Sequence, residues 1–201
     1  MPEVGLEAAS TRYLLVLGLL CVIACHNSRD EQEHVYRAAL EYIRATGELK
    51  GSAFLVGSQP EAPYDMEMQA LFGPDSMSCS SWSSIEGLDH LKERFRRANS
   101  SKLTALRKAG LIRDVMLVPV DNYRDAAGRF SWDKVFEHYG KRAGHAVSLP
   151  SSFIIFSGVG FDDWSRRALV FVRVVGYFGE YLLLEKKGPW TVKDHCRVWV
   201  S

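Results

Sequence analysis

Three histidine residues are the first candidates for chemistry in this chain, because an imidazole titrates near neutral pH and can act as a general acid or base. Each one has a carboxylate or a thiol beside it, in the pairs Asp89-His90, Glu137-His138 and His195-Cys196. The last pair holds the two groups of a cysteine nucleophile. These residue types would suit a hydrolase in which His90, His138 or His195 acts as the base.

The spacing of these pairs does not complete a catalytic set. Adjacent side chains of a β-strand point to opposite faces, so the His195 imidazole and the Cys196 thiol should diverge. His90 and His138 fall in helical patterns without a visible partner, so solvated helix residues are the simpler interpretation. We therefore assign no catalytic residue from the sequence, and the hydrolase stays an alternative.

Basic residues gather between Lys92 and Arg113, where Glu93 is the only acid. Such a segment could contact anionic lipid or a polyanionic envelope component. The residues of this candidate interface are Arg94, Arg96, Arg97 and Arg107. The alternative is a solvated helical face. The whole chain has 25 Lys and Arg against 24 Asp and Glu, a balance that argues against a nucleic-acid partner.

An uncharged apolar stretch over residues 13–24 has the length of a signal-peptide hydrophobic region. A membrane-spanning helix needs about 20 such residues. Arg12 precedes the stretch and supplies the expected positive charge, although Glu3 and Glu7 make this terminus less basic than is usual for a signal peptide. The pattern predicts export.

The end of this stretch, Val22-Ile23-Ala24-Cys25, resembles the lipobox of bacterial lipoprotein precursors. The resemblance implies that residues 1–24 are a signal peptide and that Cys25 becomes the acylated first residue, a palmitate-bearing anchor in a bacterial membrane. The domain would then face the periplasm or the cell exterior. Cys21 follows the bulky Leu20, so Cys25 is the better acceptor. Ordinary secretion and an uncleaved anchor are the alternatives.

Two further cysteines, Cys79 and Cys196, remain in the exported part. Outside the cytoplasm they can form a disulfide or stay separate thiols, and sequence does not decide between the two. Neither has the neighbours of a metal site, so no metal is expected. The Gly158-Val-Gly160 sequence is too short for a phosphate-binding loop and is interpreted as a bend. We expect no cofactor.

Periodicity predicts helices in the first two thirds of the chain. Apolar residues between Val35 and Ile43 recur at three- and four-residue steps and predict a helix ending near Thr46-Gly47. Further helices are expected over Ile85 to Arg97, Ser101 to Lys108 and Phe130 to Tyr139. A loop or weak helix is expected over Gln59 to Gly73, and an exposed serine-rich loop over Gly73 to Ser84.

Strand patterns are expected at Ser52 to Val56 and Arg113 to Val120, and four more follow in succession. These are Ser152 to Val159, Ala168 to Val175, Tyr181 to Lys186 and Trp190 to Val200. Their spacing predicts an antiparallel meander. In the last strand one face should carry Trp190, Val192, Cys196, Val198 and Val200. The chain after residue 24 is thus expected to be a single α+β domain, residues 25–201, in which helices cover one face of the sheet.

The segment from Trp132 to Ser201 is similar to the tail of a group of uncharacterised bacterial exported proteins. The likeness rests on Ser157-Gly-Val-Gly-Phe161, Ala168-Leu-Val-Phe-Val172, Gly179-Glu-Tyr-Leu-Leu-Leu-Glu-Lys-Lys187 and Trp190-Thr-Val192. It implies a shared sheet and carries no activity. The order of elements also resembles the nuclear-transport-factor-like α+β cone, a fold that hosts both enzymes and binding modules.

These patterns favour a membrane-tethered envelope lipoprotein that is not an enzyme and binds a protein or an envelope polymer. The first alternative is a hydrolase with a histidine-lined pocket between sheet and helices. The second is a small-ligand carrier, which would need a deep apolar cavity.

Overall fold

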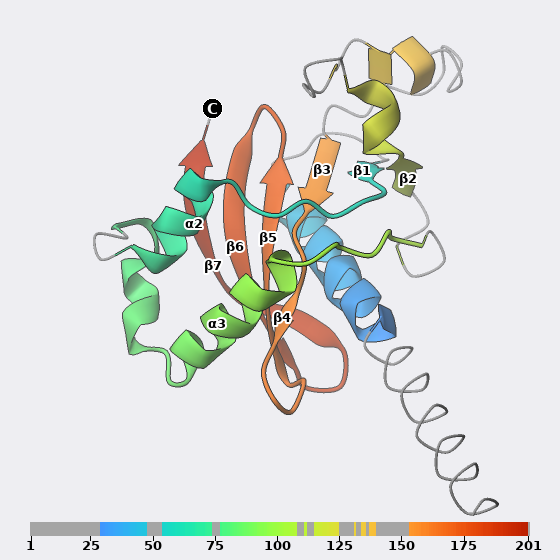
Figure 1. The fold of residues 1–201 in the computed structure, drawn as a ribbon. Coiled ribbons are helices and arrows are strands. Elements are labelled where there is room, and N and C mark those ends of the chain that lie inside the picture. Colours follow the sequence, from blue (N-terminus) through green and yellow to red (C-terminus); the bar gives the residue numbers. More distant parts are fainter. Residues whose placement is uncertain are drawn as a thin grey trace, which may run out of the picture.

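A computed structural model describes residues 29–47, 54–73, 77–107, 111, 115–124, 131, 134–135, 137–139 and 153–200. Within these residues, seven strands form one mixed sheet in the order β2-β1-β3-β5-β6-β7, and the short β4 pairs with β5 (Figure 1). Helices cover both faces of this sheet. The α+β class predicted from the sequence is confirmed.

The predicted antiparallel meander is present in the C-terminal part of the chain. It consists of β3 (Phe153–Phe156), β5 (Arg167–Val174), β6 (Phe178–Lys186) and β7 (Trp190–Val200), and each neighbouring pair is antiparallel. The two-residue β4 (Gly160–Phe161) adds a further antiparallel pairing with β5. Strands of alternating or continuous apolar residues joined by Gly-bearing turns therefore fold as the pattern predicts.

Two strands extend the meander in parallel orientation. They are β1 (Phe54–Gly57), which pairs with β3, and β2 (Val115–Val118), which pairs with β1. Parallel neighbours need a long crossover connection. The chain between β1 and β2 supplies this crossover and carries the helical segments α2 (Asp65–Phe72), the 3₁₀ segment η1 (Met77–Ser84) and α3 (Leu88–Asn99).

The first helix, residues 29–46, packs on one face of the sheet. Its apolar residues Val35, Ala39, Leu40 and Ile43 are fully buried against the even-numbered residues of β5 and β6. The helix ends at Gly47, whose φ of 68° lies in the left-handed region that favours glycine. The expected first helix and its end are confirmed.

The opposite face is covered by α2 (Asp65–Phe72), the 3₁₀ segment η1 (Met77–Ser84) and α3 (Leu88–Asn99). Their side chains pack on the odd-numbered residues of β5 and β6. A third cluster joins β1, β2, β3 and the 3₁₀ turn η3 (Val120–Tyr123) to the helical residues 134–135 and 137–139. Helices on both faces depart from the expected cone, in which they cover a single face.

Two local expectations are wrong. The serine-rich segment expected as an exposed loop contains η1, which buries Trp82 completely and Cys79 almost completely. The helix expected over Ser101 to Lys108 is absent from residues 101–107, which form no regular structure. Tertiary pairing explains the second difference, because the Leu106 backbone N–H donates to the Ser58 carbonyl over 2.7 Å.

The faces of β7 also differ from expectation. Trp190 and Val192 pack on the side of the first helix, whereas Cys196 and Val198 pack on the side of α2 and α3. Register shifts opposite Gly179/Glu180 and Leu183/Leu184 account for this, because an extra residue in one strand reverses the alternation beyond it. The apolar residues of β7 that were expected on one face are therefore divided between the two faces of the sheet.

The Gly158-Val-Gly160 segment connects β3 to β4 without an assigned bend, and its glycines have a steric reason. A Cβ atom at Gly160 would lie 2.5 Å from the Phe95 backbone of α3. One at Gly158 would lie 2.7 Å from the Leu103 side chain. Glycine at both positions thus lets α3 and the segment after it contact the sheet backbone directly.

A buried ion pair fastens α2 to the sheet. The Glu67 carboxylate accepts hydrogen bonds from Arg173 Nε on β5 over 3.1 Å and from Arg173 Nη2 over 2.6 Å. Trp199 Nε1 on β7 donates to it over 3.1 Å, and the Tyr64 backbone N–H donates over 2.7 Å. The Tyr181 hydroxyl donates to the Glu67 backbone carbonyl over 2.9 Å. One carboxylate therefore joins α2, β5 and β7.

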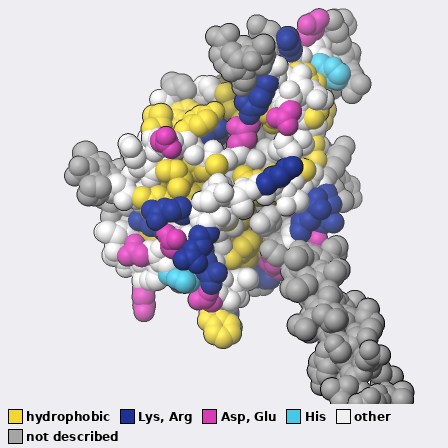
Figure 2. All heavy atoms as spheres, viewed as in Figure 1, with side chains coloured by type: hydrophobic (Ala, Val, Ile, Leu, Met, Phe, Trp, Pro, Cys, Tyr) yellow, Lys and Arg dark blue, Asp and Glu magenta, His cyan; other side chains and the backbone are white. Residues whose placement is uncertain are grey.

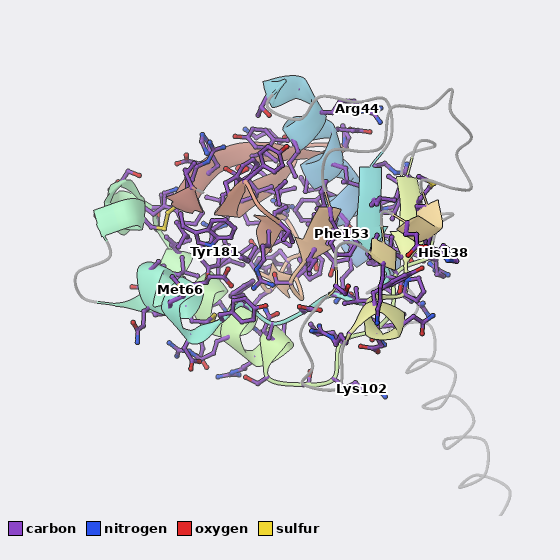
Figure 3. All side chains as sticks on the ribbon, turned by 90° about the horizontal axis from the view of Figure 1, so that it is seen from above. Arg44, Met66, Lys102, His138, Phe153 and Tyr181 are labelled. Carbon is purple, nitrogen blue, oxygen red and sulfur yellow. A yellow bond between two sulfur atoms is a disulfide. The ribbon has the colours of Figure 1, made fainter. Side chains whose placement is uncertain are left out.

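A disulfide links Cys79 of η1 to Cys196 of β7, with a Cα–Cα separation of 5.3 Å. The two cysteines that sequence left undecided are thus joined, and Figure 3 shows the sulfur–sulfur bond at the edge of the sheet. The two cysteines are 117 positions apart in the sequence. The loop that the bridge closes includes α3, β2 and the rest of the chain up to β7. It lies beside the Glu67 contacts, on the same face of the sheet.

We expect Cys79→Ser to lower the free energy of unfolding by about 4 to 5 kcal/mol, because the open chain regains the entropy of a loop of this length. Urea denaturation of the folded chain measures it. The double variant Cys79→Ser/Cys196→Ser should lose no more unfolding free energy than the single variant. Equal stability of the oxidised and the dithiothreitol-reduced wild type would show that the bridge does not constrain the fold.

Candidate functional site

A pocket lies between the first helix and the β6–β7 turn, residues 187–189. Its volume is about 420 Å³. The lining residues are Glu31, His34, Arg37, Ala38, Glu41, Lys186, Gly188, Pro189 and Trp190. The start of the first helix, this turn and the β4–β5 turn, residues 162–166, lie together at one end of the domain, which we call the lower end after its place in Figure 1.

Local structure explains why the charged residues of the pocket share one surface. Residues 31, 34, 38 and 41 follow each other at three- and four-residue steps, so they lie along one face of the first helix. The opposite face of the helix carries the buried apolar residues that pack on the sheet. Lys186 and Trp190 enter from the ends of the two strands that flank the β6–β7 turn.

Glu31 connects the first helix to the two strands beside the pocket. Its carboxylate accepts hydrogen bonds from Lys186 Nζ over 2.7 Å and from Trp190 Nε1 over 2.8 Å. Partial burial of Glu31 raises its pKa, but these two bonds and the positive charges of Lys186 and His34 outweigh that effect. The net pKa of Glu31 is therefore lowered, and the carboxylate is ionised at neutral pH.

The pocket presents both signs of charge beside an aromatic ring. Glu31 and Glu41 supply carboxylates, whereas Arg37 and Lys186 supply cations. The Trp190 ring is almost wholly buried, with Lys186 Nζ 5.8 Å from its centroid. Such a lining suits a ligand or peptide segment that carries groups of both charges beside an apolar part.

A second, shallower pocket of about 400 Å³ lies on the opposite face of the sheet, between α2 and α3. It is lined by Asp65, Met68, Gln69, Phe72, Gly73 and Arg96. The Arg96 guanidinium stacks over the Phe72 ring at 4.1 Å. The first pocket is the more enclosed of the two, so it is the better candidate.

The three predicted histidines lie apart from one another. His90 on α3 contacts Asp163 with Nε2 at 3.1 Å, and His195 on β7 contacts Glu180 with Nδ1 at 3.4 Å on the other face of the sheet. His138 is exposed and lies beside the rings of Tyr123 and Tyr139. Figure 3 shows it on the far side of the domain from Tyr181.

None of these histidines lines either pocket. The expectation that the His195 and Cys196 side chains diverge is confirmed, because the thiol is engaged in the disulfide while the imidazole lies near the Tyr42 ring. Glu180, which is fully buried, also accepts a hydrogen bond from Arg197 over 3.2 Å. His195 therefore shares its carboxylate with a guanidinium and does not have a dedicated orienting acid.

Each of the four arginines of the candidate basic interface pairs with a carboxylate. Arg94 pairs with Asp163, Arg96 and Arg97 pair with Glu93, and Arg107 pairs with Asp30 and Glu33 of the first helix. Sequence showed only the acid within the segment, and the other acids arrive from distant elements. Figure 2 shows basic and acidic side chains interspersed over the face that it presents.

The predicted lipidation site, Cys25, and the predicted signal segment lie outside the described residues. Within the described part of the chain, no helix has the length and apolar character needed to cross a bilayer. Across the same residues, no group of three or more His, Cys, Asp or Glu side chains is placed to hold a metal ion.

Comparisons of this chain with protein-family models, curated proteins and solved structures find no match. Function is therefore inferred from the geometry of the described residues.

The pocket itself was not predicted from the sequence, although the sequence contains the charged residues that line it. His34, Arg37 and Glu41 lie among the apolar residues of the first helix, but the face that they line becomes a pocket only when the β6–β7 turn packs beside it.

Glu31 gives the pocket a pH dependence. Its pKa in the folded protein is below its ordinary value of 4.5, so its contacts stabilise the fold above about pH 4.5 and lose this contribution as the pH falls through the folded-state pKa. We expect Glu31→Gln to flatten the fall in unfolding free energy between pH 5 and pH 3, measured by urea denaturation. In a Lys186→Met background the same change should have a smaller effect. If Glu31→Gln left the pH dependence of the unfolding free energy unchanged, the lowered pKa of Glu31 would be contradicted.

Proposed function

We propose that the protein is an exported lipoprotein, anchored to a bacterial membrane through acylated Cys25, whose domain is a binding module. Its binding site is the mixed-charge pocket beside Trp190, and its partner is a protein segment or an envelope polymer with charged groups. The observation that carries the binding part is the pocket lining, in which carboxylates and cations face the same space.

The disulfide supports the exported location. Bridges such as Cys79–Cys196 persist in oxidising compartments and are rare in the cytoplasm. The lipobox-like Val22-Ile23-Ala24-Cys25 sequence supports a lipid anchor in place of free secretion. Two or more acyl chains hold a protein stably on a bilayer, whereas one chain binds only marginally.

The packing supports a binding module over the two alternatives. A hydrolase of the expected kind would place His90, His138 or His195 in a pocket beside a carboxylate, and all three lie outside the two pockets described above. A carrier of apolar ligands would need space between sheet and helices. Side chains fill that space on both faces, and large aromatic rings such as Tyr36, Trp82, Phe95, Phe156 and Tyr181 are among them.

The anchor is tested by replacing each N-terminal cysteine in turn. We expect Cys25→Ser to abolish incorporation of labelled palmitate and to move the chain out of the membrane fraction, because the acylated residue is lost. Cys21→Ser is the matched control and should leave both readouts unchanged. Labelled fatty acid on the Cys25→Ser protein would show that the anchor has been assigned wrongly.

The pocket is tested by photo-crosslinking in cells. A photo-reactive residue in place of Glu41, at the rim of the pocket, should give one dominant adduct, and Arg37→Glu in the same chain should weaken it because a pocket charge is reversed. The control places the same residue at Asp121, an exposed acid on η3 outside the pocket. Equal adducts at positions 41 and 121 would contradict a specific binding site.

A further inference from the structure

Trp164 is the most exposed large hydrophobic residue of the described chain. Its exposed fraction is 82%, and it lies in the β4–β5 turn at the lower end of the domain. A tryptophan in such a position leaves a large apolar ring in water, which the fold does not require. The position therefore points to an external contact.

The turn holds Trp164 in this position by a dense set of bonds. Asp162 Oδ1 accepts the backbone N–H groups of Arg166 over 2.8 Å and Arg167 over 3.2 Å. The Ser165 N–H donates to the Asp162 carbonyl over 3.0 Å, and Ser165 adopts a φ of 49°. Trp164 is thus presented by an ordered turn.

Contacts with α3 fix the orientation of this turn. The Asp163 carboxylate pairs with Arg94 and with His90, both on the exposed side of α3. Arg167 Nη1 donates to the Glu86 carbonyl over 2.7 Å. Asp163 therefore points toward α3, and the neighbouring Trp164 is left facing solvent. Little conformational entropy remains for the turn to lose on binding.

The start of the first helix lies at the same end of the molecule as Trp164. Glu31 is bonded to Lys186, whose backbone N–H donates to the Arg166 carbonyl over 2.7 Å. The first helix and the Trp164 turn are therefore connected through a single residue of β6. Figure 1 shows both at the lower end, away from η3.

The proposed anchor must lie close to this end. Cys25 is four residues before position 29, and four residues of chain span at most about 14 Å. Acyl chains on Cys25 would thus hold the lower end of the domain near the bilayer. A weak contact becomes populated under these conditions, because the tether raises its effective concentration to the millimolar range.

The chemistry of Trp164 fits the membrane–water interface. Tryptophan is enriched at the headgroup level, where its apolar ring and its N–H group are both satisfied. The charges around the turn are paired, as in Arg94–Asp163 and Lys187–Glu185, so the surface has no strong requirement for anionic lipid.

We propose that Trp164 inserts into the headgroup region of the bilayer that holds Cys25, and that this contact orients the lower end of the domain toward the membrane. The inference rests on the proposed lipid anchor. It adds a second membrane contact, made by the folded domain, and it places the rim of the pocket beside the membrane surface.

The test uses the full acylated protein, reconstituted in phosphatidylcholine vesicles with or without bromine on the acyl chains near the headgroup. We expect brominated lipid to quench tryptophan emission of the wild type and Trp164→Phe to lose most of that quenching. Trp82→Phe, which alters a fully buried ring of η1 whose Nε1 makes no hydrogen bond with the described residues, is the matched control and should keep it.

The outcomes separate the two proposals. An acylated protein whose quenching does not depend on Trp164 overturns the membrane contact and leaves the anchor intact. A Trp164→Phe variant that changes the protein from dimer to monomer, without bromine quenching in the wild type, assigns Trp164 to a second copy and also overturns it. A protein without lipid at Cys25 overturns the anchor, and the membrane contact with it.

Discussion

The carboxylate of Glu67 is the constraint on which the second layer of this fold depends. A buried carboxylate is tolerated only when donors replace its water, and here Arg173, Trp199 and the Tyr64 backbone supply them from β5, β7 and the start of α2. Loss of Arg173 would leave the Glu67 carboxylate buried without its cation. Because α2, η1 and α3 belong to one crossover, fixing α2 also fixes the path by which β2 reaches the sheet. The Cys79–Cys196 bridge closes the same layer against β7.

Local patterns in the sequence predicted the elements whose partners are near in the chain. The alternation and turn residues after Phe153 predicted the meander, and the helical periodicity from Val35 to Ile43 predicted the first helix. Long-range features were not predictable in this way. The parallel pairing of β1 with β3, the irregularities of β7 and the irregular path of residues 101–107 depend on contacts between distant segments. The acids that pair with Arg94 and Arg107 were not predictable for the same reason, since Asp163, Asp30 and Glu33 reach these arginines only in the folded chain.

The proposed function brings three features to one end of the domain. The pocket beside Trp190, the Trp164 turn and the start of the first helix lie together, and Lys186 connects them through its side chain to Glu31 and through its backbone to Arg166. A module held in this way would meet its partner close to the membrane surface. The sequence contained signals for each feature, namely a charged face within an amphipathic helix, an aromatic residue in a polar turn and a lipobox-like segment. Only the fold places the first two side by side.

The mass of the N-terminal peptide of the protein purified from its native membrane tests the central claim most directly. The account predicts a peptide that begins at Cys25 and is heavier than its sequence by at least two acyl chains, the number that stable anchoring requires. An unmodified peptide that begins at His26, or an intact Met1 terminus without lipid, would contradict it.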